Sequence, residues 1–135
     1  MAALVLIGCT PREVKPLDEE TMKSITHIQK IGVAYNRAYQ ANREAPKSAD
    51  DVKKFLKQEP GGPDPLVSLN DGKPVIIVPG VPNNAPPEAG VRSIVAYEQT
   101  GVNGKRLMVD IRGMVHTVTD KEFSEIKFAG GHIPK

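Results

Sequence analysis

The feature that most constrains the fold is a long run of helical periodicity near the start of the chain. Apolar side chains recur there at intervals of three and four residues, at Met22, Ile25, Ile28, Ile31, Tyr35, Ala38 and Tyr39. This spacing predicts one helix over residues 18–42, about six turns long, with a single apolar stripe. Asp18 is a favourable N-cap for this helix, and Glu19 and Glu20 suit its first turn. The stripe needs an apolar surface to cover it.

Five short runs of β-branched and aliphatic residues supply that surface, and they lie at residues 66–69, 75–78, 93–97, 106–110 and 114–118. Asp71-Gly72 separates the first two runs and Asn103-Gly104 separates the next two, and both pairs favour the tight turn of a β-hairpin. Arg112-Gly113 then turns the chain into the fifth run. The pattern predicts two hairpins and up to five antiparallel strands, on which the helical stripe packs.

Two short helices complete the predicted domain. Residues 48–51 resemble a capping box and predict a short helix after them. Thr119 or Asp120 caps a last helix through Lys127, and an irregular tail is expected beyond it. A chain of 135 residues fits one domain. We therefore expect a single α+β domain over residues 18–135, with an N-terminal amphipathic helix packed on a small antiparallel sheet of two hairpins and a short C-terminal helix.

The start of the chain predicts a lipid anchor. Residues 1–8 are apolar or small, and the single cysteine, Cys9, follows Leu6-Ile7-Gly8. This order resembles the bacterial lipobox, in which an aliphatic, a variable and a small residue precede the cysteine that receives diacylglycerol. The resemblance implies that residues 1–9 are a lipoprotein signal remnant, that residues 10–17 are a tether and that Cys9 is lipidated. The protein would then be exported and membrane-anchored, on the periplasmic or cell-surface side.

Two interpretations of this segment stay open. A signal peptide usually holds about 15–30 residues with a basic start, whereas eight residues without a charged side chain precede Cys9. Either the true start lies upstream of Met1, or the segment is a buried strand with an inert cysteine. We favour the lipoprotein because the apolar run stops at Cys9 and a polar segment with Pro11 and Pro16 follows. A membrane-spanning segment is not expected, because spanning needs about 20 apolar residues.

The order of one helix followed by antiparallel strands resembles the heads of pilins and pseudopilins. Several segments also match a narrower group, namely residues 31–35, 46–51, 70–74, 96–98, 104–106 and 119–123. They resemble small planctomycete-type lipoproteins related to prepilin-like proteins of type II secretion-like systems. Those proteins commonly carry Asp-Gly-His at the last turn, where this chain has Arg112-Gly113-Met114. The resemblance implies a structural or binding module of the cell envelope, and it carries over no catalytic residue.

The proline-rich segment 79–90 is the candidate partner site. Prolines stiffen a loop and so reduce the entropy that is lost on binding, and long loops in compact domains are often functional. The candidate partner-binding residues are Pro82, Asn83, Asn84, Pro86 and Pro87. The expected partner is an envelope protein whose identity the residues do not reveal. The alternative is a solvated connector that keeps strand edges from pairing.

Composition and motif spacing argue against other function classes. The net charge is +2 with acidic and basic residues interspersed, so no basic stripe with aromatic residues predicts nucleic-acid binding. His27, His116 and His132 lack the paired spacing of metal ligands, and no acidic cluster adjoins them in the sequence. We expect no metal, no cofactor and no catalytic residue. The alternative is an enzyme or an enzyme accessory whose active-site residues are dispersed along the chain.

Overall fold

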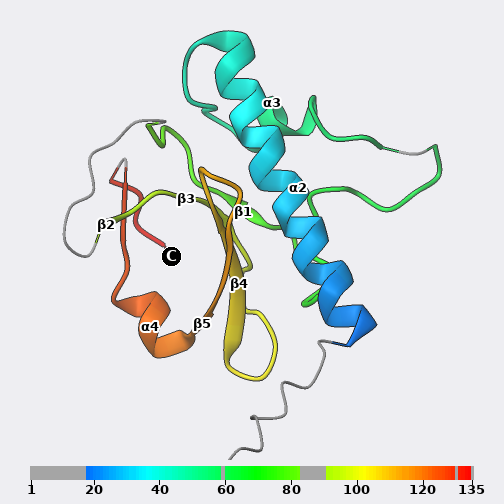
Figure 1. Cartoon of the computed structure of the whole chain (residues 1–135), viewed down its shortest axis with the longest axis vertical. Coiled ribbons are helices and arrows are strands. Elements are labelled where there is room, and N and C mark those ends of the chain that lie inside the picture. The colour runs from blue at the N-terminus through cyan, green and yellow to red at the C-terminus, as the bar shows by residue number, and fades with distance from the viewer. Residues whose placement is uncertain (1–17, 59, 83–90, 130, 135) are drawn as a thin grey trace, which may run out of the picture.

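The structure is a computed structural model that describes residues 18–58, 60–82, 91–129 and 131–134. Within these ranges a long helix lies across one face of an antiparallel sheet (Figure 1). The elements in chain order are α2 (Glu19–Asn42), α3 (Ala49–Lys53), β1 (Ile76–Ile77), β2 (Val91–Arg92), β3 (Ile94–Tyr97), β4 (Lys105–Asp110), β5 (Val115–Thr119), α4 (Asp120–Ser124) and β6 (Lys127–Phe128). Four strands form a sheet in the order β1-β3-β4-β5, and β2 pairs with β6 in a separate parallel sheet. The expected α+β class, with a long N-terminal helix, an antiparallel sheet and a short C-terminal helix, is confirmed.

Helix α2 forms where the apolar spacing predicts it. Asp18 is the N-cap, and its Oδ1 accepts a hydrogen bond of 2.7 Å from the backbone N–H of Thr21. The stripe is buried through Ile28, Ile31, Ala34, Tyr35 and Ala38. Met22 was expected in the stripe but is 49% exposed, because the first turn of α2 extends past the sheet (Figure 1). Among the described residues, no helix combines the length and the apolarity that crossing a bilayer requires.

The hairpin of β3 and β4 also forms as predicted. Asn103 and Gly104 have φ values of 55° and 73°, and a type I′ turn requires positive values at both positions. The chain then turns through Gly113, whose φ is 85°, into β5. Strands β4 and β5 pair antiparallel, from Lys105 opposite Thr119 to Val109 opposite Val115.

The first predicted hairpin is wrong in part. Residues 66–69 form no strand, and their pairing with the next run is reduced to an isolated bridge between Val67 and Pro74. Pro74 has no N–H to donate to a ladder, so the pairing cannot continue regularly there. The following residues, Ile76 and Ile77, pair instead with Tyr97 and Ala96 of β3. The antiparallel sheet therefore has four strands.

Ser48 is the N-cap of α3 as expected, but the predicted capping box and the predicted end of the last helix need correction. The side chain of Ser48 makes no capping hydrogen bond to α3, and Oδ2 of Asp51 instead accepts one of 3.1 Å from the backbone N–H of Lys47. Helix α4 begins with a complete capping box of Thr119 and Glu122, but it ends at Ser124. The chain then extends into β6, which pairs in parallel with β2, so the tail begins as a strand where an irregular segment was expected.

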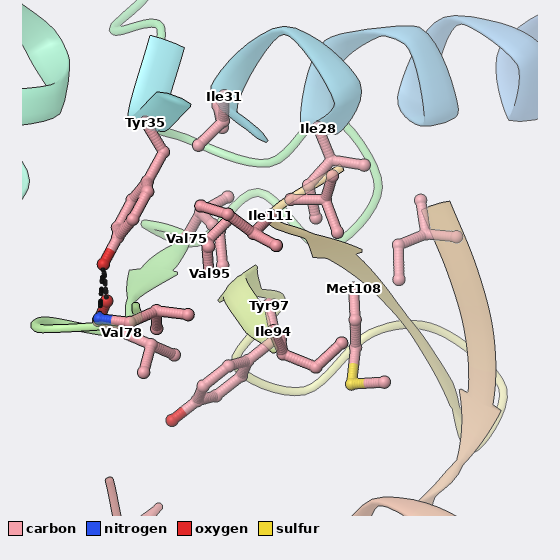
Figure 2. Packing of buried hydrophobic residues seen from close by; sticks show 14 of the residues in the cluster. Ile28, Ile31, Tyr35, Val75, Val78, Ile94, Val95, Tyr97, Met108 and Ile111 are labelled. Carbon is pink, nitrogen blue, oxygen red and sulfur yellow. Dashed lines mark hydrogen bonds between the residues drawn. The ribbon is translucent and has the colours of Figure 1, made fainter. Parts of the chain in front are cut away.

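The two faces of the sheet bury different parts of the core. Figure 2 shows Ile28 and Ile31 of α2 pointing toward the sheet, while Met108 points away from the helix to the opposite face. The helix lies very close to β4 at Gly32, which has no Cβ. A Cβ added there would lie 2.5 Å from Cγ2 of Val109. On the opposite face, aromatic residues of β3, α4 and β6 pack together. The sheet is therefore a layer that is covered on both faces.

Candidate functional site

Most of the residues that the sequence singled out lie outside the described part of the chain. These are Cys9 and the tether 10–17, and Asn83, Asn84, Pro86 and Pro87 of the candidate partner loop. Pro82 is described and is half-buried. The structure therefore describes where this loop leaves the domain, through residues 78–82.

The start of that loop is fixed to α2 by one buried tyrosine. The hydroxyl of Tyr35 donates a hydrogen bond of 2.8 Å to the carbonyl oxygen of Val78 and accepts one of 3.0 Å from the N–H of Val81. Figure 2 shows the ring reaching from the helix to this segment. Burial raises the pKa of Tyr35 to about 12. In addition, the N–H of Gly80 donates to the carbonyl of Pro46 at 3.0 Å. The loop therefore begins from a fixed backbone position.

A groove of about 560 Å³ lies between α2 and the segment after α3, and we call it the α2 groove. Its floor is apolar and includes Val33, Ala34, Phe55, Leu56 and Pro65. Val33 is 43% exposed, and the side chains of Phe55 and Leu56 are partly buried against the core. Ligand sites commonly have volumes of about 300–1,000 Å³ and mainly apolar linings. The α2 groove has the size and the lining of a small binding site.

Three cations line the α2 groove, and none of the described residues that line it carries a carboxylate. They are Lys30 and Arg37 of α2 and Lys57 after α3. None of the three takes part in an ion pair among the described residues. His27 also lines the groove, but its Nε2 lies 2.9 Å from the carbonyl oxygen of Val67. Because a carbonyl only accepts, that nitrogen donates, and the bond holds the ring to the neighbouring loop.

A larger hollow of about 820 Å³ lies beside α4, β6 and residues 131–134, and we call it the C-terminal hollow. The guanidinium of Arg106 lies 3.9 Å from the centre of the Phe123 ring. Its Nη2 lies 3.1 Å from Oδ1 of Asp120, and its Nη1 donates to the carbonyl of Gln99 at 2.9 Å. Its Nε is buried and has no hydrogen-bond partner among the described atoms. Arg106 is thus held by stacking on Phe123 and by hydrogen bonds to its neighbours.

An aromatic cluster forms the wall of the C-terminal hollow. The Tyr97 ring centre lies 5.0 Å from that of Phe123 and 5.4 Å from that of Phe128. The Tyr97 hydroxyl is hydrogen-bonded to Nε2 of His132 at 2.7 Å. Burial lowers the pKa of His132 and raises the pKa of Tyr97. This cluster attaches the C-terminal residues to the face of the sheet that α2 does not cover.

The sequence did not single out Glu98 as a buried charged residue, although it is fully buried in the domain. Its Oε1 accepts hydrogen bonds from the backbone N–H of Leu107 at 2.7 Å and from Nδ2 of Asn70 at 3.0 Å. Its Oε2 is hydrogen-bonded to the hydroxyl of Ser68. These contacts join the 68–73 turn to the end of β3 and to β4. An acidic residue directly after the buried strand Ile94–Tyr97 is the only local signal for this network.

The fold brings one of the three histidines, His116, to an acidic side chain. Nε2 of His116 lies 3.0 Å from Oδ2 of Asp110, because the β4–β5 hairpin brings together residues that the sequence separates. The other oxygen of Asp110 accepts from the backbone N–H groups of Arg112 and Met114, so the pair belongs to a turn. Within the described ranges, no group of three or more His, Cys, Asp or Glu side chains is placed to hold a metal ion.

Comparison of the chain with protein-family models, with curated proteins and with solved structures found no match. The function therefore has to be argued from the residues and from the geometry.

Proposed function

We propose that the chain is a non-enzymatic, lipid-anchored module of the bacterial cell envelope, which binds an envelope partner through its exported domain. The observation that carries the anchor is the order Leu6-Ile7-Gly8-Cys9, followed by a polar segment. Residues 10–18 reach at most about 30 Å when fully extended. A head that begins with α2 at Glu19 is then held close to the bilayer.

The arrangement of α2 on a four-stranded antiparallel sheet supports a pseudopilin-like head. Such a head presents its surface to partners, while its long helix is fixed to the sheet. The α2 groove supports a binding role, because it combines exposed apolar surface with three cations that have no ion-pair partner among the described residues. Exposed apolar surface rimmed by polar groups is typical of interaction sites.

The candidate loop supplies a second contact in this proposal. Residues 79–82 leave the domain from a backbone position that Tyr35 fixes, so a partner at Pro82 to Pro87 would meet a loop with a defined origin. Replacing residues 83–87 with a Gly-Ser linker should leave the melting transition almost unchanged and remove the envelope proteins that co-purify with the wild type. Retention of the same proteins at the same yield would make the loop a connector only.

Metabolic labelling tests the anchor. The gene is expressed in a bacterial host with labelled palmitate, and the wild type is compared with Cys9→Ser. We expect label in the wild type alone, and we expect the wild type in the membrane fraction after cell breakage. Equal labelling of the two proteins would refute the lipoprotein interpretation.

A further inference from the structure

We propose that the α2 groove binds an acidic peptide segment with apolar side chains, contributed by the envelope partner. The proposal rests on the binding function above and names the chemistry of its partner. The groove is a recess between α2 and the segment after α3, with an apolar floor and cations along its sides. A complementary ligand places apolar side chains on the floor and carboxylates beside the cations.

The spacing of the charges defines what fits. Lys30 and Arg37 lie on one face of α2, seven residues and so about 10 Å apart along the axis. Val33 lies between them on the same face and is 43% exposed. Lys57 lines the groove from the segment after α3. A peptide that carries an apolar side chain between two carboxylates about 10 Å apart therefore matches this side of the groove.

The nearby carboxylates leave this positive field largely uncompensated. Asp64 lies on the same side of the domain as α3, but it is paired with Lys53 at 3.8 Å. Glu19 is paired with Lys23 at 3.5 Å near the start of α2, about three turns before Lys30 and about five turns before Arg37. Within the described ranges of the chain, no acidic residue lines the groove itself. An acidic ligand therefore meets three cations without displacing an ion pair among the described residues.

The shape of the groove favours a peptide over a bilayer surface. The apolar floor is recessed, and Phe55 and Leu56 are partly buried on it. A flat layer of lipid headgroups contacts the protruding cations, whereas a side chain can enter the recess and contact the floor. The tether of this chain is a poor occupant, because residues 10–17 carry Arg12 and Lys15 against the single acid Glu13.

The test uses the full chain with Cys9→Ser, so that no acyl chain is added, and three fluorescein-labelled synthetic peptides. The first peptide alternates Leu and Phe with Asp and Glu. The second replaces every acid with Lys, and the third keeps the acids and replaces Leu and Phe with Ser. Fluorescence anisotropy measures their affinities at low salt and again at about 0.5 M salt, where charge interactions are strongly screened. We expect only the first peptide to bind, and more weakly at high salt.

Charge reversal locates the binding site. The double variant Lys30→Glu, Arg37→Glu should weaken binding by at least about tenfold, because two attractions become repulsions. The matched control is the double variant Lys105→Glu, Lys121→Glu, which changes the net charge by the same amount at exposed positions away from the groove. Its affinity for the first peptide should stay within about twofold of that of the unmodified chain. Val33→Glu, which puts a carboxylate on the floor, should also weaken binding. Circular dichroism confirms that each variant is folded.

Three results would overturn the proposal. The control pair could weaken binding as much as the groove pair, or the third peptide could bind as well as the first. Vesicles of phosphatidylglycerol could instead bind through Lys30 and Arg37 while no peptide binds, which would make the groove a lipid-facing surface. Failure here is separable from failure of the proposed anchor, because the palmitate label on Cys9 is read independently of peptide binding.

Discussion

Removing the hydroxyl of Tyr35 tests how the partner loop is fixed to the domain. Tyr35→Phe keeps the ring, which is fully buried against the core, and deletes one oxygen. That oxygen joins the carbonyl of Val78 to the N–H of Val81, and both of those residues are fully buried. The variant therefore leaves one acceptor and one donor without a partner in a place that water does not reach.

The expected cost follows from those two groups. Each buried polar group without a partner costs about 1–3 kcal/mol of stability. Part of the cost of the two groups is offset, because the variant no longer has to bury the polar hydroxyl itself. We expect Tyr35→Phe to lower the free energy of unfolding by about 2–4 kcal/mol, which is a large share of the 5–15 kcal/mol that is typical of a domain. Urea denaturation measures this loss, and the slope of the free energy of unfolding against urea concentration should be the same as in the wild type.

A matched control is available on the same helix. Tyr39 is half-buried, and its hydroxyl makes no hydrogen bond among the described residues. Tyr39→Phe should change the free energy of unfolding by less than about 0.5 kcal/mol. Hydrogen exchange supplies a local measurement, because the amide of Val81 should lose protection in Tyr35→Phe and keep it in Tyr39→Phe. Equal costs for the two variants, with Val81 still protected, would refute the bridging role of the hydroxyl.

Three further variants test the core and the C-terminal residues. Ile31→Ala should lower the free energy of unfolding by about 2–5 kcal/mol in urea denaturation, because Ile31 is fully buried. Lys23→Ala, on the exposed face of α2, should lower it by less than about 0.5 kcal/mol. Equal losses of stability in the two variants would mean that the apolar stripe is misassigned. Burial lowers the pKa of His132 in the folded protein below 6.5. As the pH falls, the unfolded chain therefore takes up a proton at this histidine before the folded protein does. The free energy of unfolding should then decrease as the pH drops from 6.5 through the pKa of the folded state. His132→Gln should show a shallower fall in that range, and identical pH profiles of the two proteins would contradict the assignment.

Local signals in the sequence were enough to predict the elements that carry their own periodicity or turn chemistry. The stripe of α2 repeats over several turns, so its position could be read without knowledge of its partner. The β3–β4 hairpin was equally accessible, because Asn103-Gly104 supplies both positive φ values. Thr119, one of the two residues expected to cap the last helix, is the N-cap of α4, and Glu122 completes its capping box. Each of these features depends on residues that are close in the chain.

The features that the sequence did not reveal depend on distant residues. Strands β2 and β6 are each two residues long, too short to show a recognisable period, and β3, β4, β5 and α4 separate them in the chain. The stacking of Arg106 on Phe123 joins β4 to α4. The α2 groove combines Lys30 with Lys57, and their proximity follows only from the way α3 packs beside α2. Pairings of this kind are products of the tertiary fold.

The buried Glu98 bears most directly on the choice between a binding module and an enzyme. Its carboxyl group is hydrogen-bonded to the Ser68 hydroxyl, as a general base would be to a serine nucleophile. This contact is the observation that would favour the enzyme alternative. However, Glu98 is fully buried and Ser68 is 6% exposed, and neither residue lines the α2 groove or the C-terminal hollow. Both oxygens of the carboxyl group are hydrogen-bonded, and Oγ of Ser68 also accepts from the N–H of Asn70 at 3.1 Å. A nucleophile has to reach its substrate, and Ser68 is buried away from both cavities, so this geometry favours a structural tie between the 68–73 turn and the sheet.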